Sequence, residues 1–219
     1  MNKSGSAEVA EDYVSVIGTS YLYPIASLLD ALLVFEPKGP NEVQASSVEN
    51  GYSAAIIVLT VLMIESFINR AQYLFAQTSG PRNPYDFVRY CYPNSGWEVK
   101  IRELSVLRDV IAHNHLWEAH FMWDEEAGMK LVGKPEKRLG YGDNKFDKAV
   151  EPSSRLTRTL GLNVFPTKIC YSDVKIVLKT AVDFLLFLES QDRRIINFSS
   201  QRVRHQGRLM SFVEVVRGL

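Results

Sequence analysis

The 219-residue chain has little of what would place it in a specialised class of proteins. It contains only two cysteines, Cys91 and Cys170, which lie far apart and form no C-x-x-C pattern. This scarcity argues against a disulfide framework and against a cysteine zinc site, and it fits a reducing compartment. The first residues, "MNKSGSAEVAEDY", are polar and acidic and lack the apolar stretch of a signal peptide. We therefore expect a cytoplasmic protein.

Long apolar runs and an excess of one charge are also missing. The most apolar run, "SAAIIVLTVLMI", has 12 residues, whereas a membrane-spanning helix needs about 20, so we expect a buried core helix and no membrane partner. The formal net charge is zero, which gives no overall field to attract nucleic acid. The charge is unevenly distributed, however. Residues 1–50 hold seven acidic and two basic residues, and residues 191–219 hold six basic and two acidic ones. An acidic first segment and a basic last segment are compatible with a contact between subunits or with a local surface that binds a polyanion.

Apolar periodicity predicts four long helices, at about residues 12–35, 46–77, 96–118 and 173–191. The stretches "EPKGP" and "TSGPRNP" end the first two. After the third, "HFMWDEEAGMKLVG" predicts a short β-hairpin. We expect one all-α domain over residues 1–219, an up-down helical bundle with a small β-hairpin insertion before the last core helix. The irregular insertion covers about residues 119–168, and a basic segment at about 192–219 is expected to form a last helix.

The third predicted helix has two apolar sides. One stripe contains Trp97, Ile101, Leu104, Leu107 and Ile111, and the other contains Val99, Val106, Val110 and Trp117. Such a helix is expected to lie between other elements or at a subunit interface. Arg108 falls beside the first stripe, where a charge needs a partner. Asp109 and His113 are spaced i,i+4, so that the carboxylate can orient the imidazole.

The sequence "LRDVIAHN", Leu107 to Asn114, resembles the signature of the HEPN superfamily of small helical bundles. In that signature an arginine, often followed by a polar residue, precedes a histidine by four to six intervening residues. Here these are Arg108, Asp109 and His113. The alternative histidine, His115, also satisfies the spacing, but the Asp-x-x-x-His form favours His113. The second predicted helix, with Glu65 inside "VLMIESFINR", resembles the apolar helix with an embedded glutamate that many such domains carry.

The resemblance implies an endoribonuclease that uses no metal and no cofactor, of the kind found in bacterial toxins and phage defence. It implies a homodimer in which the two motifs face each other, with RNA as substrate and an antitoxin or defence-system protein as a possible partner. His113 would move a proton near neutral pH, and Arg108 would stabilise the charged phosphorane. Asp109 would orient the histidine, and Glu65 would hold Arg108.

The basic C-terminal segment, "RRIINFSSQRVRHQGR", has two readings. In the first, Arg202, Arg204 and Arg208 contact RNA phosphates. In the second, the arginines cover apolar surface or pair with the acidic N-terminal segment. The mixture of arginines with apolar residues slightly favours the second.

Three other functions compete with RNA cleavage. The first is a metal site, with donors from His113, His115, Glu118, His120 and Asp124, but no histidine pair has the i,i+4 spacing of helical ligands. The second is a non-catalytic HEPN-like module that binds nucleic acid, a nucleotide or a protein. The third is a helical scaffold. A nuclease needs its arginine and histidine exposed in a shared groove, whereas a scaffold should have them buried and paired.

Overall fold

The computed structural model describes residues 17–35, 49–76, 81–113, 116–125, 128–139 and 143–219. The fold is mainly α-helical, and the strands of the described residues form two separate antiparallel hairpins. In chain order the elements are η1 (Gly18–Tyr21), α1 (Leu22–Leu32), α2 (Glu49–Ala76), α3 (Pro84–Cys91), α4 (Trp97–Ala112), β1 (Leu116–Asp124), β2 (Gly128–Leu139), α5 (Asp143–Ala149), η2 (Pro166–Lys168), α6 (Tyr171–Gln191), β3 (Arg202–His205), β4 (Arg208–Ser211) and α7 (Phe212–Arg217).

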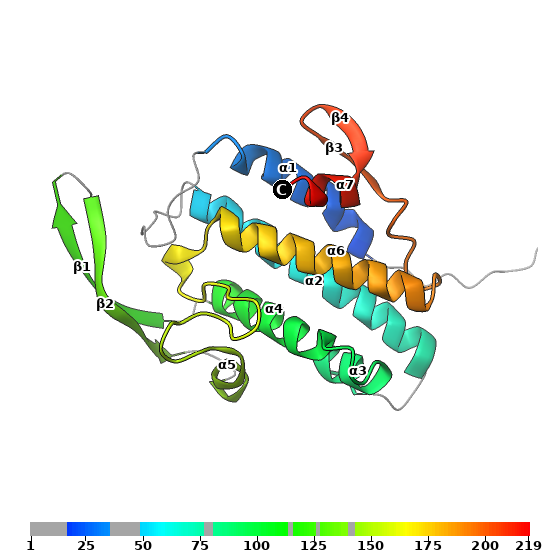
Figure 1. Cartoon of the computed structure of the whole chain (residues 1–219), viewed down its shortest axis with the longest axis horizontal. Coiled ribbons are helices and arrows are strands. Elements are labelled where there is room, and N and C mark those ends of the chain that lie inside the picture. Colours follow the sequence, from blue (N-terminus) through cyan, green and yellow to red (C-terminus); the bar gives the residue numbers. More distant parts are fainter. Residues whose placement is uncertain (1–16, 36–48, 77–80, 114–115, 126–127, 140–142) are drawn as a thin grey trace, which may run out of the picture.

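Helix α2 is the centre of the bundle and packs against α1, α4 and α6 (Figure 1). Its side chains Ile56, Ile64 and Phe67 are buried in the main core. Gly18 of η1 lies so close that a Cβ atom there would be 2.6 Å from the Phe67 ring, so only glycine allows this packing. Over Glu49–Phe75, α2 is long and apolar enough to cross a membrane by length and composition, and half of its most apolar window is buried inside the protein. The expected core helix is present, but its apolar segment, 27 residues long, extends beyond the 12-residue run seen in the sequence.

Helix α4 ends at Ala112, which is earlier than the predicted end at Glu118. His113 is the C-cap, and residues 116–124 belong to β1. The expected β-hairpin is present, but it begins before residue 119 and its second strand continues to Leu139. Trp117 leaves the helical register because its ring packs against the aromatic rings of Phe146 and Phe165.

The second apolar side of α4 is covered by the insertion. Val106 and Val110 form a separate small core with Phe146 and Ala149 of α5, and Trp117 packs against it. Helix α4 therefore lies between α2 on one side and α5 on the other, as expected, and both elements belong to the same chain. Helix α5 was not predicted, because its seven residues carry too few apolar positions to show a period.

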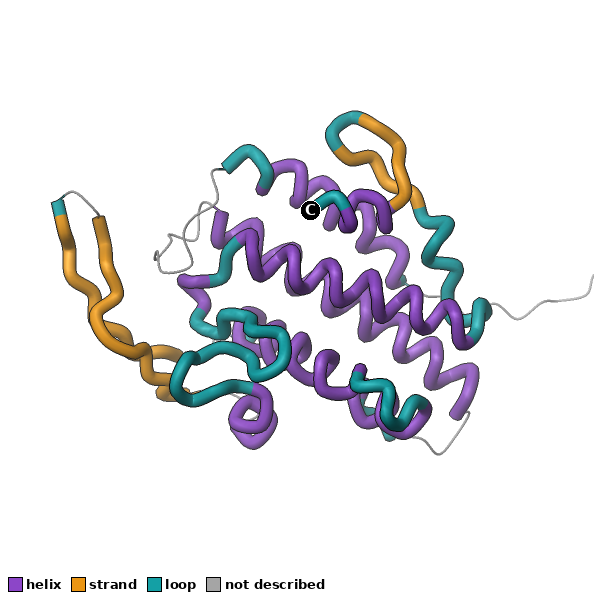
Figure 2. The backbone as a smooth tube through the Cα atoms, in the orientation of Figure 1, coloured by secondary structure: helices purple, strands orange, loops and turns teal. Residues whose placement is uncertain are grey.

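The loop between α5 and η2, drawn in teal in Figure 2, is anchored by two buried carboxylates. Glu103 of α4 accepts hydrogen bonds from the backbone N–H groups of Thr159 and Leu160, both at 2.8 Å. Asp173 of α6 accepts one from the backbone N–H of Asn163 at 2.9 Å. These bonds satisfy backbone groups that have no helical or sheet partner. The segment expected to be irregular therefore has a defined shape.

The basic C-terminal segment is not the helix that the sequence was expected to form. It contains the hairpin β3–β4 and only the short helix α7. Gln206 and Gly207 connect the strands and have φ values of 47° and 77°, as a two-residue type I′ turn requires. Arg202 and Arg204 are exposed and alternate with two buried residues, which is the period of a strand and not of a helix.

Candidate functional site

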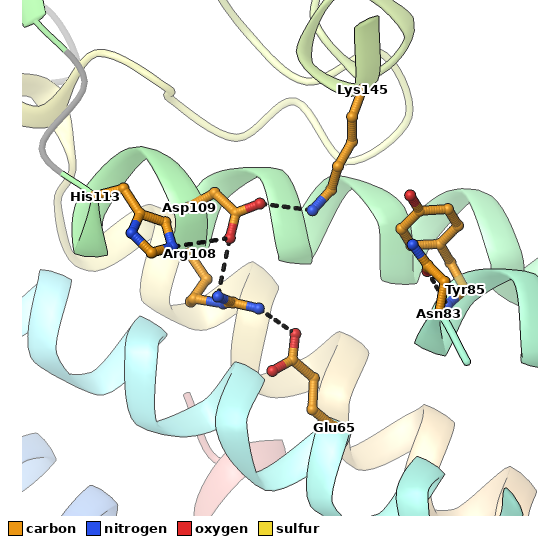
Figure 3. Close-up of polar contacts among 7 residues, drawn as sticks. All are labelled: Glu65, Asn83, Tyr85, Arg108, Asp109, His113 and Lys145. Atoms are coloured by element: carbon orange, nitrogen blue, oxygen red, sulfur yellow. Dashed lines mark hydrogen bonds and ion pairs between the residues drawn. The ribbon is translucent and has the colours of Figure 1, made fainter. Parts of the chain in front are cut away.

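Arg108 lies on the side of α4 that faces α2 (Figure 3). Its Nη2 donates to Oε1 of Glu65 at 2.6 Å, and its Nη1 lies 3.0 Å from Oδ1 of Asp109. The Arg108 side chain is 22% exposed and that of Glu65 is 17% exposed. A guanidinium at this depth needs a charged partner, and the glutamate embedded in α2 supplies it. The expected contact between Glu65 and Arg108 is therefore present.

Asp109 is shared between two cations. Its Oδ1 contacts Arg108, and its Oδ2 accepts a hydrogen bond from Nζ of Lys145 at 2.6 Å. Lys145 comes from α5, and its ammonium lies 5.7 Å from the centre of the Tyr85 ring. No sequence pattern predicts Lys145 at this position, because it lies in the insertion and 36 positions away from Asp109. Two carboxylates and two cations, from Glu65, Arg108, Asp109 and Lys145, make the network neutral.

His113 stands at the open end of this network. Its backbone N–H donates to the carbonyl of Asp109 at 2.9 Å, which closes the last turn of α4. Its Nε2 lies 3.9 Å from Oδ1 of Asp109, which is too far for a hydrogen bond. The side chain is 50% exposed. At this distance the contact is not the direct hydrogen bond expected of an orienting partner.

The other histidines lie apart from this group or outside the described residues. His115, the alternative partner of Arg108, lies outside the described residues. His120 and Glu118 lie on β1, beyond the end of the helix. Within the described part of the chain, no group of three or more His, Cys, Asp or Glu side chains lies close enough to hold a metal ion.

The three arginines proposed to contact RNA do not share one face. Arg202 and Arg204 lie on the solvent face of β3, whereas Arg208 is paired with His205 across the hairpin. Side chains of directly paired residues point to the same side of a sheet, so Arg208 lies on the opposite face from the other two. Two arginines, and not three, can track one strand of nucleic acid along the outer surface.

The acidic N-terminal segment does contact this hairpin, but through other residues than the arginines. A carboxylate oxygen of Asp30 in α1 lies against Nδ1 of His205, and the carboxylate accepts a hydrogen bond from the backbone N–H of Gln206 at 3.0 Å. In the described residues the side chains of Arg202 and Arg204 have no carboxylate partner. They therefore keep their charge available to an anion.

The chain matches no family model, and comparisons with curated proteins and with solved structures gave no match. The likeness to HEPN proteins therefore depends on the Arg108–His113 spacing and on the helical bundle that carries it.

Proposed function

We propose that the protein is a metal-independent endoribonuclease of the HEPN type. The observation that carries the proposal is the placement of Arg108 and His113 on neighbouring turns at the end of α4, both in contact with Asp109. The guanidinium is held by Glu65 and is 22% exposed, and the imidazole is half exposed; the proposal requires that a phosphate group reach both from the end of the helix. Positioned proton transfer and fixed positive charge are the two needs of this reaction.

The proposed reaction uses the RNA's own 2′-hydroxyl as nucleophile. A base removes its proton, the 2′-oxygen forms a bond to phosphorus, and the bond from phosphorus to the 5′-oxygen breaks as that oxygen receives a proton. The products are a 2′,3′-cyclic phosphate and a 5′-hydroxyl. His113 moves one of these protons, and Arg108 stabilises the negative charge of the phosphorane. The nucleophile is part of the substrate, so no activated water is required.

One histidine cannot hold both positions along the line of displacement. We propose that a second copy of the chain supplies the other, in a homodimer with the two motifs facing each other. The exposed Arg202 and Arg204 would bind RNA backbone outside the cleft. A cytoplasmic toxin or phage-defence effector, controlled by an antitoxin or a defence-system protein, fits this activity.

One observation favours a second candidate, a non-catalytic HEPN-like module that binds nucleic acid, a nucleotide or a protein. Arg108 already contacts two carboxylates, those of Glu65 and Asp109, and its Nε is buried and has no hydrogen-bond partner in the described residues. A substrate phosphate has to compete with Asp109 for the remaining Nη hydrogens. A module that only binds would show the same pairing without needing to break it.

The deciding experiment compares RNA cleavage by the purified full chain, in EDTA, with cleavage by His113→Ala and His120→Ala. We expect wild-type cleavage with cyclic phosphate ends, a loss of about 100-fold or more in His113→Ala, and no loss in His120→Ala. The control removes an exposed histidine from β1 without touching the network. A parallel His115→Ala variant decides which histidine acts with Arg108.

Cleavage at the wild-type rate by both His113→Ala and His115→Ala would rule out the proposed catalytic pair. RNA binding without cleavage, weakened by Arg108→Gln, would instead support the non-catalytic module. The same preparations can be examined by analytical ultracentrifugation, because the facing motifs require a dimer.

A further inference from the structure

A cavity of about 650 Å³ lies between β2, the loop after α5 and the start of α6. These elements lie together at one end of the molecule (Figure 1). The cavity is lined by apolar groups from Leu131, Phe165 and Ile176 and by two cations, Arg155 and Lys168. Neither Arg108 nor His113 is among its lining residues. Its volume is within the usual range for small-molecule sites, about 300–1,000 Å³.

Arg155 is held in this cavity at an energetic cost. Its backbone is in the left-handed region, with φ at 59°, where an arginine is strained. Its Nε is buried and has no hydrogen-bond partner in the described residues, which is unfavourable for a polar group. Its guanidinium lies over the Trp117 ring, with Cζ 6.0 Å from the ring centre. Strain of this kind persists where the surrounding structure imposes it, and it is concentrated at functional sites.

The two cations of the cavity are not neutralised. In the described residues neither Arg155 nor Lys168 has a carboxylate partner. The acid in the lining, Asp173, is 2% exposed, and its oxygens accept from Asn163 and from the backbone N–H of Cys170. Burial raises the pKa of this carboxyl, while the hydrogen bonds from Asn163 and Cys170 lower it. The open surface of the cavity is therefore positive.

The wall that carries Arg155 is preorganised. The backbone N–H of Arg155 donates to the carbonyl of Glu151 at 2.9 Å, and the carbonyl of Arg155 accepts from Val164 at 3.3 Å. The same loop is tied to α4 through Glu103. Ser154 lines the cavity too, and its Oγ accepts from the backbone N–H of Leu156, so its hydroxyl hydrogen remains available to donate. Donors held in this way lose little conformational entropy when a ligand binds.

We infer that this cavity binds a small phosphate monoester with a planar apolar body. Arg155 and Lys168 take the phosphate, with the hydroxyl of Ser154 as a further donor, and Leu131 and Phe165 contact the apolar body. A monoester carries a charge of about −1.5 to −2 at pH 7 and three acceptor oxygens, which suits two cations and a hydroxyl donor better than a carboxylate does. The inference does not depend on ribonuclease activity.

Calorimetric titration of the full chain tests this inference, with phenyl phosphate as the probe. We expect it to bind at least about tenfold more tightly than inorganic phosphate, because the ring removes apolar surface from water. It should also bind more tightly than the diester methyl phenyl phosphate, which has one negative charge. Affinity should rise between pH 5 and 7, as the second proton of the monoester, with a pKa of about 6, is lost.

Substitutions of lining residues test whether phenyl phosphate binds in this cavity. Arg155→Lys and Lys168→Gln should each weaken phenyl phosphate binding about tenfold or more, because each loses a charge-assisted hydrogen bond. Lys179→Gln is the matched control, since it removes an exposed lysine from α6 outside the cavity. Circular dichroism shows whether each variant is folded, and Lys168→Gln keeps the test valid if Arg155→Lys is not.

Three results would overturn the inference. The first is the absence of binding by phenyl phosphate at millimolar concentration. The second is equal affinity for the monoester, the diester and inorganic phosphate. The third is unchanged affinity in both cavity variants. Loss of RNA cleavage in His113→Ala has no bearing on any of them, so the two proposals fail separately.

Discussion

Arg108 and Arg155 are both partly buried arginines, but their charges have different partners. Arg108 belongs to a regular helix and contacts two carboxylates, from Glu65 and Asp109. Arg155 belongs to a loop, has a positive φ, and lies over an aromatic ring without a carboxylate partner in the described residues. The charge of Arg108 is therefore balanced by neighbouring carboxylates, whereas the charge of Arg155 is not balanced and lies at the wall of the cavity.

The difference shows what burial alone does not reveal about a charged group. A paired arginine is stable without a ligand, and a substrate has to displace or share its partner. An unpaired arginine destabilises the protein when no anion is bound, and other contacts around it must compensate for this loss. The network at Arg108 is therefore organised for positioning, and the cavity at Arg155 is organised for binding. Three substitutions test this contrast.

The largest effect is expected from Glu103→Ala, which removes the anchor of the cavity loop. Glu103 is 1% exposed, and its loss leaves the N–H groups of Thr159 and Leu160 without their acceptor. We expect the free energy of unfolding to fall by about 3 kcal/mol, which corresponds to roughly 6–12 °C in Tm for a chain of this length. Hydrogen exchange at these two amides should accelerate, and phenyl phosphate binding should be lost.

Glu98→Ala is the control for this change, because Glu98 lies on the same helix but, among the residues that the structure describes, pairs only with Arg102, one turn away. Such an i,i+4 pair contributes about 0.5 kcal/mol or less. If both variants lost equal stability, the carboxylate of Glu103 would not be anchoring the loop.

A smaller effect is expected from Glu65→Gln, which keeps the shape of the side chain and removes its charge. Its partner Arg108 would keep Asp109 and could donate to the new amide oxygen, but its shortest contact would no longer be an ion pair, so we expect a loss of about 1–2 kcal/mol in the free energy of unfolding. Chemical denaturation of Glu65→Gln, Arg108→Gln and the double variant measures the coupling between the two residues. A coupling free energy close to zero would mean that the ion pair contributes no stability, and that Arg108 is not stabilised by its contact with Glu65.

The sequence predicted the bundle well because the long helices carry their own signals. The period of Ile101, Leu104 and Leu107 marked the buried side of α4, and the second stripe with Val106 and Val110 marked a side that α5 does cover. Glu65 and Arg108 were recognisable as partners, since each is a charge in an otherwise apolar pattern. The contact between them required only that α2 and α4 pack together.

What the sequence did not show depends on contacts between distant segments. Lys145 reaches Asp109 from an insertion whose fold has no period of its own. Arg155 stands out only through its backbone angle and its position over Trp117, and neither is visible in a sequence. The C-terminal hairpin had a readable signal, because Gln206–Gly207 lies between alternating residues, but the many arginines and apolar residues suggested a helix instead.

The smallest effect, and the sharpest test of the unpaired arginine, is expected from Arg155→Asn. Asparagine tolerates a positive φ better than arginine, and the substitution removes the buried Nε that has no partner in the described residues. It also removes the contact with Trp117, worth about 0.5–1 kcal/mol. We expect these terms nearly to cancel, so that the free energy of unfolding changes by less than about 1 kcal/mol while phenyl phosphate binding is lost. A residue that can be replaced without loss of stability, but not without loss of binding, is kept for its ligand. If denaturation instead showed a loss as large as that of Glu103→Ala, Arg155 would be a structural residue, and the two arginines would differ only in the partner that stabilises them.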